Sequence, residues 1–84
     1  MGKIHVGTTY EVVGGHKVKI ISELDGNKVG KIVQTFMPEH RHKLSIGQLV
    51  YVEFDGLLLK FKPDGRRSSL CVGRLVTEFV PAHV

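Results

Sequence analysis

Basic side chains close to one aromatic residue give this sequence its clearest binding chemistry. Lys60 and Lys62 alternate along a predicted strand, Arg66 and Arg67 follow it, and Tyr51 lies on the strand before it. Ammonium and guanidinium groups bind phosphates, and an aromatic ring stacks on a nucleobase with about 1 to 3 kcal/mol. This combination predicts contact with nucleic acid.

The segment from residue 37 to residue 47 adds two basic residues to this predicted surface. It contains a proline and no alternating pattern, so we expect a long loop beside the central hairpin. The complete predicted nucleic-acid-binding set is Arg41, Lys43, Tyr51, Lys60, Lys62, Arg66 and Arg67. The formal net charge of +4 also favours an anionic partner.

A protein is the alternative partner for the same face. Leu49, Tyr51 and Leu58 are predicted to lie together on the outside, and in this interpretation Lys60 is only a cation–π partner of Tyr51. Exposed apolar side chains on a small sheet with unpaired edges favour association. We therefore also predict a homodimer, because a twofold dimer is the commonest closed assembly.

Catalytic residues are not indicated by the sequence. Asp25, Asp55 and Asp64 each precede a glycine, which is typical of turns in which the carboxylate bonds nearby backbone. The glutamates are isolated among strand residues, without a second carboxylate placed for acid–base chemistry. We predict a protein that is not an enzyme and that uses no cofactor.

Metal binding is not predicted either. His40 and His42 provide half of a zinc site, but no other histidine or cysteine has the paired spacing that would complete it. Cys71, the one cysteine, has apolar neighbours and is expected to be a buried, inert thiol.

The central hairpin around Asp55-Gly56 organises the predicted fold. This dipeptide predicts a two-residue type I′ turn, which places Val52 opposite Leu59 and Tyr51 opposite Lys60. Because side chains alternate between faces, one face of the hairpin is expected to be apolar and to belong to the core. Its members are Val50, Val52, Phe54, Leu57, Leu59 and Phe61.

Extended segments are also predicted outside the hairpin. They cover residues 8–13, 16–24, 28–36 with a bend or bulge at Gly30, and one long strand at 68–80 that kinks at Gly73. No segment has a helical period over ten residues. Short strands in so small a chain predict an all-β fold, a single-domain SH3-like or OB-like barrel of five to six strands over residues 1–84.

Composition places the chain among ordinary globular domains. Hydrophobic residues make up 42% and charged residues 24% of its 84 residues, enough for one small core. No apolar run approaches the roughly 20 residues that a membrane-spanning helix requires, and no secretory signal is recognised. We expect a cytoplasmic protein without a membrane partner.

One family resemblance covers about residues 15–33, roughly 20 of the 84 residues. Residues 15–21, Gly-His-Lys-Val-Lys-Ile-Ile, and residues 25–33, Asp-Gly-Asn-Lys-Val-Gly-Lys-Ile-Val, resemble the KOW-type pattern of small SH3-like barrels. In that pattern a glycine precedes a valine-rich strand, and a second glycine-containing turn leads to Gly-Lys-Ile. The resemblance implies a barrel whose loops contact RNA, DNA or a protein tail.

Overall fold

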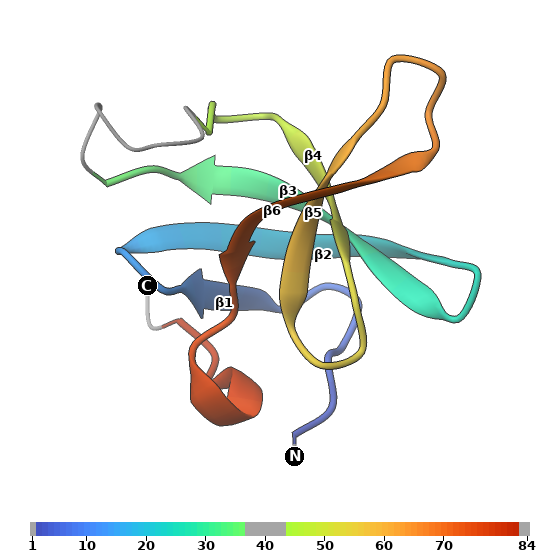
Figure 1. Ribbon diagram of the computed structural model, residues 1–84. Helices are drawn as coiled ribbons and strands as arrows, with labels where there is room; N and C mark the ends of the chain where they lie inside the picture. Colours follow the sequence, from blue (N-terminus) through green and yellow to red (C-terminus); the bar gives the residue numbers. More distant parts are fainter. Residues whose placement is uncertain (1, 37–43, 83–84) are drawn as a thin grey trace.

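The fold is one antiparallel sheet of six strands. The computed structural model describes residues 2–36 and 44–82. Each strand pairs with the next one in the chain, and the sheet curls strongly (Figure 1). The elements are β1 (Thr9–Val12), β2 (His16–Leu24), β3 (Asn27–Gln34), β4 (Leu49–Val52), β5 (Leu57–Phe61), β6 (Arg67–Arg74) and the short 3₁₀ helix η1 (Thr77–Phe79). The predicted all-β class is therefore confirmed.

The two-residue type I′ turn lies in the β2–β3 hairpin. Leu24 pairs with Asn27, and the two residues between them, Asp25 and Gly26, have φ of 50° and 81°. Positive φ at both central positions defines this turn. The sequence predicts this geometry for Asp55-Gly56 instead, and that prediction is wrong.

The β4–β5 hairpin has a three-residue loop. The N–H of Gly56 donates to the carbonyl of Glu53 at 2.9 Å, and the N–H of Glu53 donates to the carbonyl of Leu57 at 2.9 Å. Only Gly56 in this loop has a positive φ, 91°, as in a type I turn followed by a glycine bulge. The extra loop residue moves the pairing of the two strands by one position.

This register changes which side chains reach the core. Val52 pairs with Leu58, not with Leu59, and both Val52 and Leu58 are fully buried. Phe54, expected in the core, is instead 68% exposed at the loop. A one-residue shift moves the side chains of β5 to the opposite face, which brings Leu58 into the core in place of Leu59. Phe54 is exposed because it belongs to the three-residue loop.

The core lies on the concave side of the curled sheet and takes side chains from every strand. It comprises Ile4, Tyr10, Val12, Val18, Ile20, Ile32, Leu44, Val50, Val52, Leu58, Val72, Leu75 and Phe79. Gly30 pairs with Ile20 and Val50, and the irregularity beside it lies in β2, where Ile21 is the extra residue between Ile20 and Ser22, so the bulge predicted for Gly30 itself is wrong. A second irregularity lies between Lys17 and Val18, where β3 contains the extra residue Val33.

The segment after β6 covers the free edge of β1. β6 ends at Arg74, so the single strand predicted for residues 68–80 is shorter than expected, and η1 follows. Isolated bridges join Val12 to Leu75 and Tyr10 to Pro81. Backbone hydrogen bonds add to these bridges, for example from the Val76 N–H to the Glu11 carbonyl at 2.9 Å. β1 is thereby connected to the segment after β6, without a continuous strand ladder. Within the described residues, no helix has the length and apolar character to cross a membrane.

Candidate functional site

A groove of about 840 Å³ lies between the β2–β3 hairpin and the β5–β6 hairpin. The two hairpins project on the same side of the molecule, with β4 between them (Figure 1). Because Val50 and Val52 face the core, Tyr51 of β4 faces the groove. The groove is also lined by Leu24, Asp25, Asn27, Lys62, Gly65, Arg66, Arg67, Ser68 and Ser69.

Tyr51 forms the floor of the groove and is held there by two contacts. Its side chain is buried, with the residue only 4% exposed, and its hydroxyl accepts a hydrogen bond from Asn27 Nδ2 at 2.9 Å. The Phe61 ring meets the Tyr51 ring edge to face, with centroids 6.0 Å apart. Since each contact fixes the ring, Tyr51 is a preformed platform.

Arg67 covers the face of this platform. Its Cζ atom lies 5.6 Å from the centre of the Tyr51 ring, a cation–π distance. Arg67 is exposed and opposite Phe61, at the start of β6. The group that a ligand meets first is therefore a flat guanidinium, which binds phosphate and also stacks on planar rings.

Arg66 is partly neutralised by its own turn. Its Nε and Nη2 both lie 2.8 Å from Asp64 Oδ2, and its backbone N–H donates to Asp64 Oδ1 at 3.0 Å. The side-chain bond from Arg66, followed by its backbone bond, lowers the pKa of Asp64 below the usual aspartate value. Arg66 therefore offers less free positive charge to a ligand than Arg67 or Lys62.

The predicted basic set is only partly brought together. Tyr51, Lys62, Arg66 and Arg67 line one groove, whereas Lys60 does not. Lys60 pairs with Val50, and Leu59 takes the place beside Tyr51 that the sequence predicts for Lys60. The cause is again the one-residue shift of the β4–β5 hairpin. Arg41 and Lys43 lie outside the described residues.

The alternative apolar surface is not assembled. Leu58 is fully buried in the core and Tyr51 is buried on the opposite face, so only Leu49, which is 47% exposed, remains available. The predicted face of Leu49, Tyr51 and Leu58 is therefore wrong as a single surface.

One residue of the site is missed by the sequence prediction. Asn27 links Tyr51 to the β4–β5 loop, but an asparagine after Asp-Gly indicates only a turn.

A pair of lysines outside the groove is missed as well. Lys19 and Lys31 are direct cross-strand partners, which is unfavourable for like charges. Neither lysine has an ion pair within the described residues, and neither lines the groove.

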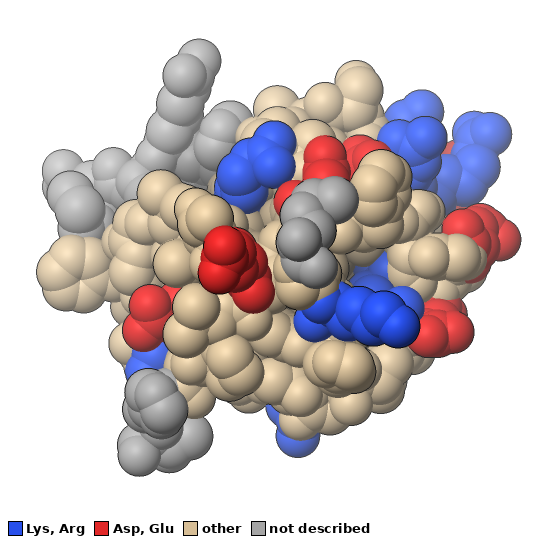
Figure 2. Space-filling model, turned by 90° about the horizontal axis from the view of Figure 1, so that it is seen from below, with Lys and Arg blue, Asp and Glu red and all other residues tan. Residues whose placement is uncertain are grey.

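Charge on the side of the two hairpins is mixed. On the right of Figure 2, toward which both hairpins extend in Figure 1, several Lys and Arg side chains lie together with Asp and Glu side chains. The basic character of the groove therefore rests on its own lining residues Lys62, Arg66 and Arg67.

Other reactive residues do not form a site in the described part of the chain. Residues 2–36 and 44–82 contain no group of three or more metal-ligating side chains. His40, His42 and His83 lie outside these ranges. Cys71 is exposed, contrary to the prediction of a buried thiol, because Val72 is the residue of this pair that turns toward the core.

Comparisons with known proteins give no match. No family model, no curated protein and no solved structure is significantly similar to this chain. The assignment of function therefore rests on the groove itself.

Proposed function

We propose that the protein is a small non-enzymatic module that binds single-stranded nucleic acid in the groove between its two projecting hairpins. Lys62 and Arg67 contact phosphates, and a base stacks on the Arg67 guanidinium, which rests on Tyr51. The observation that carries the proposal is the Arg67–Tyr51 pair at 5.6 Å, in a groove that Lys62 also lines. Cations beside stacking groups are the common pattern of single-strand binding sites.

A single strand suits this groove better than a duplex. Stacking on Arg67 requires an unpaired base whose face is free, and duplex bases offer no such face to a protein surface. The β2–β3 and β5–β6 hairpins form the two sides of the groove and leave it open for an extended chain. The binding is expected to tolerate many sequences, because every base has a stacking face.

The barrel and the KOW-type resemblance are part of the same proposal. The sequential strand order and the bridges between β1 and the segment after β6 support an SH3-like barrel. The segment that resembles the KOW pattern corresponds to β2 and most of β3, including the turn at one side of the groove. A binding role for that turn is what the resemblance implies.

Fluorescence anisotropy with a labelled eight-nucleotide single strand, DNA or RNA, tests this function. We expect binding at about 50 mM salt that weakens steeply by about 200 mM, because neutralised phosphates release counterions. Arg67→Ala removes both a phosphate contact and the stacking surface and should weaken binding about 5- to 30-fold.

Lys60 and Lys62 provide a matched pair of variants for this experiment. Each alanine substitution removes one positive charge, but only Lys62 lines the groove. Lys62→Ala should weaken binding and lower the salt slope by about one, and Lys60→Ala should do much less. Absence of binding at low salt, or equal losses in the two variants, would contradict the proposed site.

A further inference from the structure

A second hollow of about 360 Å³ lies at the end of the sheet, next to the groove. The N-terminal segment, the β2–β3 turn and the β4–β5 loop surround it. Its main side chains are Lys3, Ile4, Asn27, Lys28 and Phe54. None of these residues other than Asn27 belongs to the groove described above.

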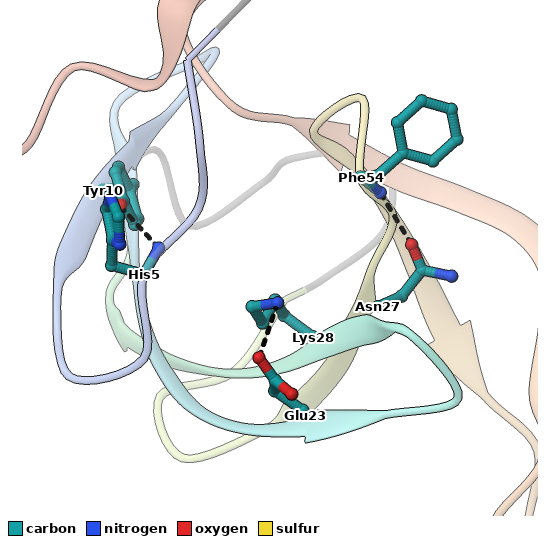
Figure 3. A network of polar contacts seen from close by, with 6 residues as sticks. All are labelled: His5, Tyr10, Glu23, Asn27, Lys28 and Phe54. Atoms are coloured by element: carbon teal, nitrogen blue, oxygen red, sulfur yellow. Dashed lines mark hydrogen bonds and ion pairs between the residues drawn. The ribbon is translucent and has the colours of Figure 1, made fainter.

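Phe54 is an aromatic side chain that folding leaves in solvent. It is 68% exposed, although it lies in a hairpin whose neighbouring residues Val52 and Leu58 are fully buried. Its backbone N–H donates to Asn27 Oδ1 at 2.8 Å, and its ring projects outward from the loop (Figure 3). Because the loop is fixed by this bond, the ring is available for stacking with little loss of backbone freedom.

One free lysine and one paired lysine line this hollow. Lys28 Nζ lies 3.0 Å from Glu23 Oε1, so its charge is partly neutralised, as that of Arg66 is by Asp64. Lys3 is exposed and has no ion pair within the described residues. The hollow thus combines an exposed aromatic ring with one free ammonium group.

Asn27 connects the groove and the hollow. Its Oδ1 accepts from Phe54 N–H and its Nδ2 donates to Tyr51 Oη, so one amide fixes the aromatic residues on both sides. Asn27 also lines both the groove and the hollow, so the two are neighbours along one surface. A ligand that leaves the groove over Asn27 reaches Phe54 directly.

We propose that the end hollow is a second nucleotide subsite, in which a base stacks on Phe54 and the adjoining phosphate contacts Lys3, so that one strand occupies both the groove and the hollow. This inference rests on the proposed function and deepens it, because it assigns a length to the bound strand. A strand of three nucleotides fills the groove alone, whereas one of eight reaches Phe54.

The test compares thymidine oligonucleotides of three and eight nucleotides on the wild-type protein and two variants. Phe54→Leu keeps an apolar side chain but removes the aromatic face, and Phe54→Tyr keeps the face. Phe54→Leu should weaken binding of the eight-nucleotide strand about 5- to 30-fold and leave the three-nucleotide strand unchanged. Phe54→Tyr should behave as the wild type at both lengths.

Each other outcome is distinguishable. Binding of neither strand to the wild-type protein contradicts the proposed function. If both strands bind and Phe54→Leu has no effect, the groove stands and the second subsite is wrong. An equal loss at both lengths means that Phe54 acts through the shape of the groove, which also overturns the subsite.

Discussion

Gly30 shows, at the scale of one residue, how little room the core leaves. A Cβ atom at this position would lie 2.5 Å from Val18 Cγ2 and 3.3 Å from Val52 Cγ2. Real Cβ atoms essentially never come as close as 2.5 Å to another heavy atom, so the Val18 side chain would have to shift, and the 3.3 Å contact leaves Val52 little room to give way. The sequence suggests a bulge at this glycine, whereas the actual requirement is close packing between strands.

Gly30→Ala should therefore destabilise the protein by about 1 to 3 kcal/mol, as overpacking of a core does. Lys31→Ala is the control, since Lys31 is exposed on the next position of the same strand. Urea unfolding followed by circular dichroism measures both variants. Equal midpoints for the two variants would mean that β3 packs less closely than described.

Asp64 carries the one resolved pKa shift in the described residues, and it reports on the β5–β6 turn. Hydrogen bonds from the Arg66 side chain and backbone lower its pKa below the usual value of about 3.9. A lowered carboxyl pKa stabilises the folded form above the unfolded pKa, and this contribution is lost as pH falls through the folded pKa. The turn should thus hold at neutral pH and loosen only in acid, below about pH 4.

Arg66→Gln should raise the pKa of Asp64 toward the usual value, because the side-chain bond is the largest cause of the shift. An NMR titration of the Asp64 carboxyl carbon checks this prediction in both proteins. An unchanged pKa in Arg66→Gln would assign the shift to the backbone bond alone.

The β4–β5 hairpin decides, at the scale of an element, which residues belong to the site. Leu58→Ala should cost about 2 to 4 kcal/mol because Leu58 is fully buried, and Phe54→Ala should change stability by less than about 0.5 kcal/mol. The register predicted from a two-residue turn would instead make Phe54→Ala the more destabilising of the two substitutions. Chemical denaturation of the two variants therefore distinguishes the registers, and a larger loss for Phe54→Ala would restore the predicted one.

The three Asp-Gly turns explain why the sequence could predict the strands but not their register. Asp25-Gly26 forms a two-residue loop, whereas Asp55-Gly56 and Asp64-Gly65 complete three-residue loops. Asp55 and Asp64 each accept a backbone N–H two residues ahead, at 3.2 Å and 3.0 Å, so their predicted role in turns is confirmed. Pro63 suits the second position of a type I turn and is a signal for the longer loop, but nothing comparable precedes Asp55.

This ambiguity separates the predictable and unpredictable parts of the site. Lys62, Arg66 and Arg67 were predictable as groove residues because they lie next to a turn, where register matters little. The position of Lys60 depends on the register of the β4–β5 hairpin and could not be predicted. Asn27 and Phe54 acquire their roles only when the β2–β3 turn and the β4–β5 loop meet, 27 residues apart in the chain.

The contacts of the segment after β6 bear on association at the scale of the whole molecule. The segment after β6 bonds to the edge of β1, so this edge is not free for a second copy. The homodimer stays a prediction, but its contact has to differ from the predicted apolar face. Leu58→Glu should unfold the protein instead of producing a folded monomer, because it buries a charge in the core.

Light scattering together with circular dichroism distinguishes these results. A folded Leu58→Glu protein of half the wild-type mass would contradict the assignment of Leu58 to the core. A wild-type protein that is monomeric at high micromolar concentration would rule out the homodimer without affecting the groove.

Chemical-shift mapping with an eight-nucleotide single strand tests the central claim most directly. Titration of the ¹⁵N-labelled protein at about 50 mM salt should give the largest amide shifts at Asn27, at Tyr51 and from Lys62 to Ser69. The turn at Gly14 and Gly15, on the opposite side of the molecule in Figure 1, should hardly respond. Saturable shifts confined to the side of that turn, or no shifts at all, would contradict nucleic acid binding in this groove.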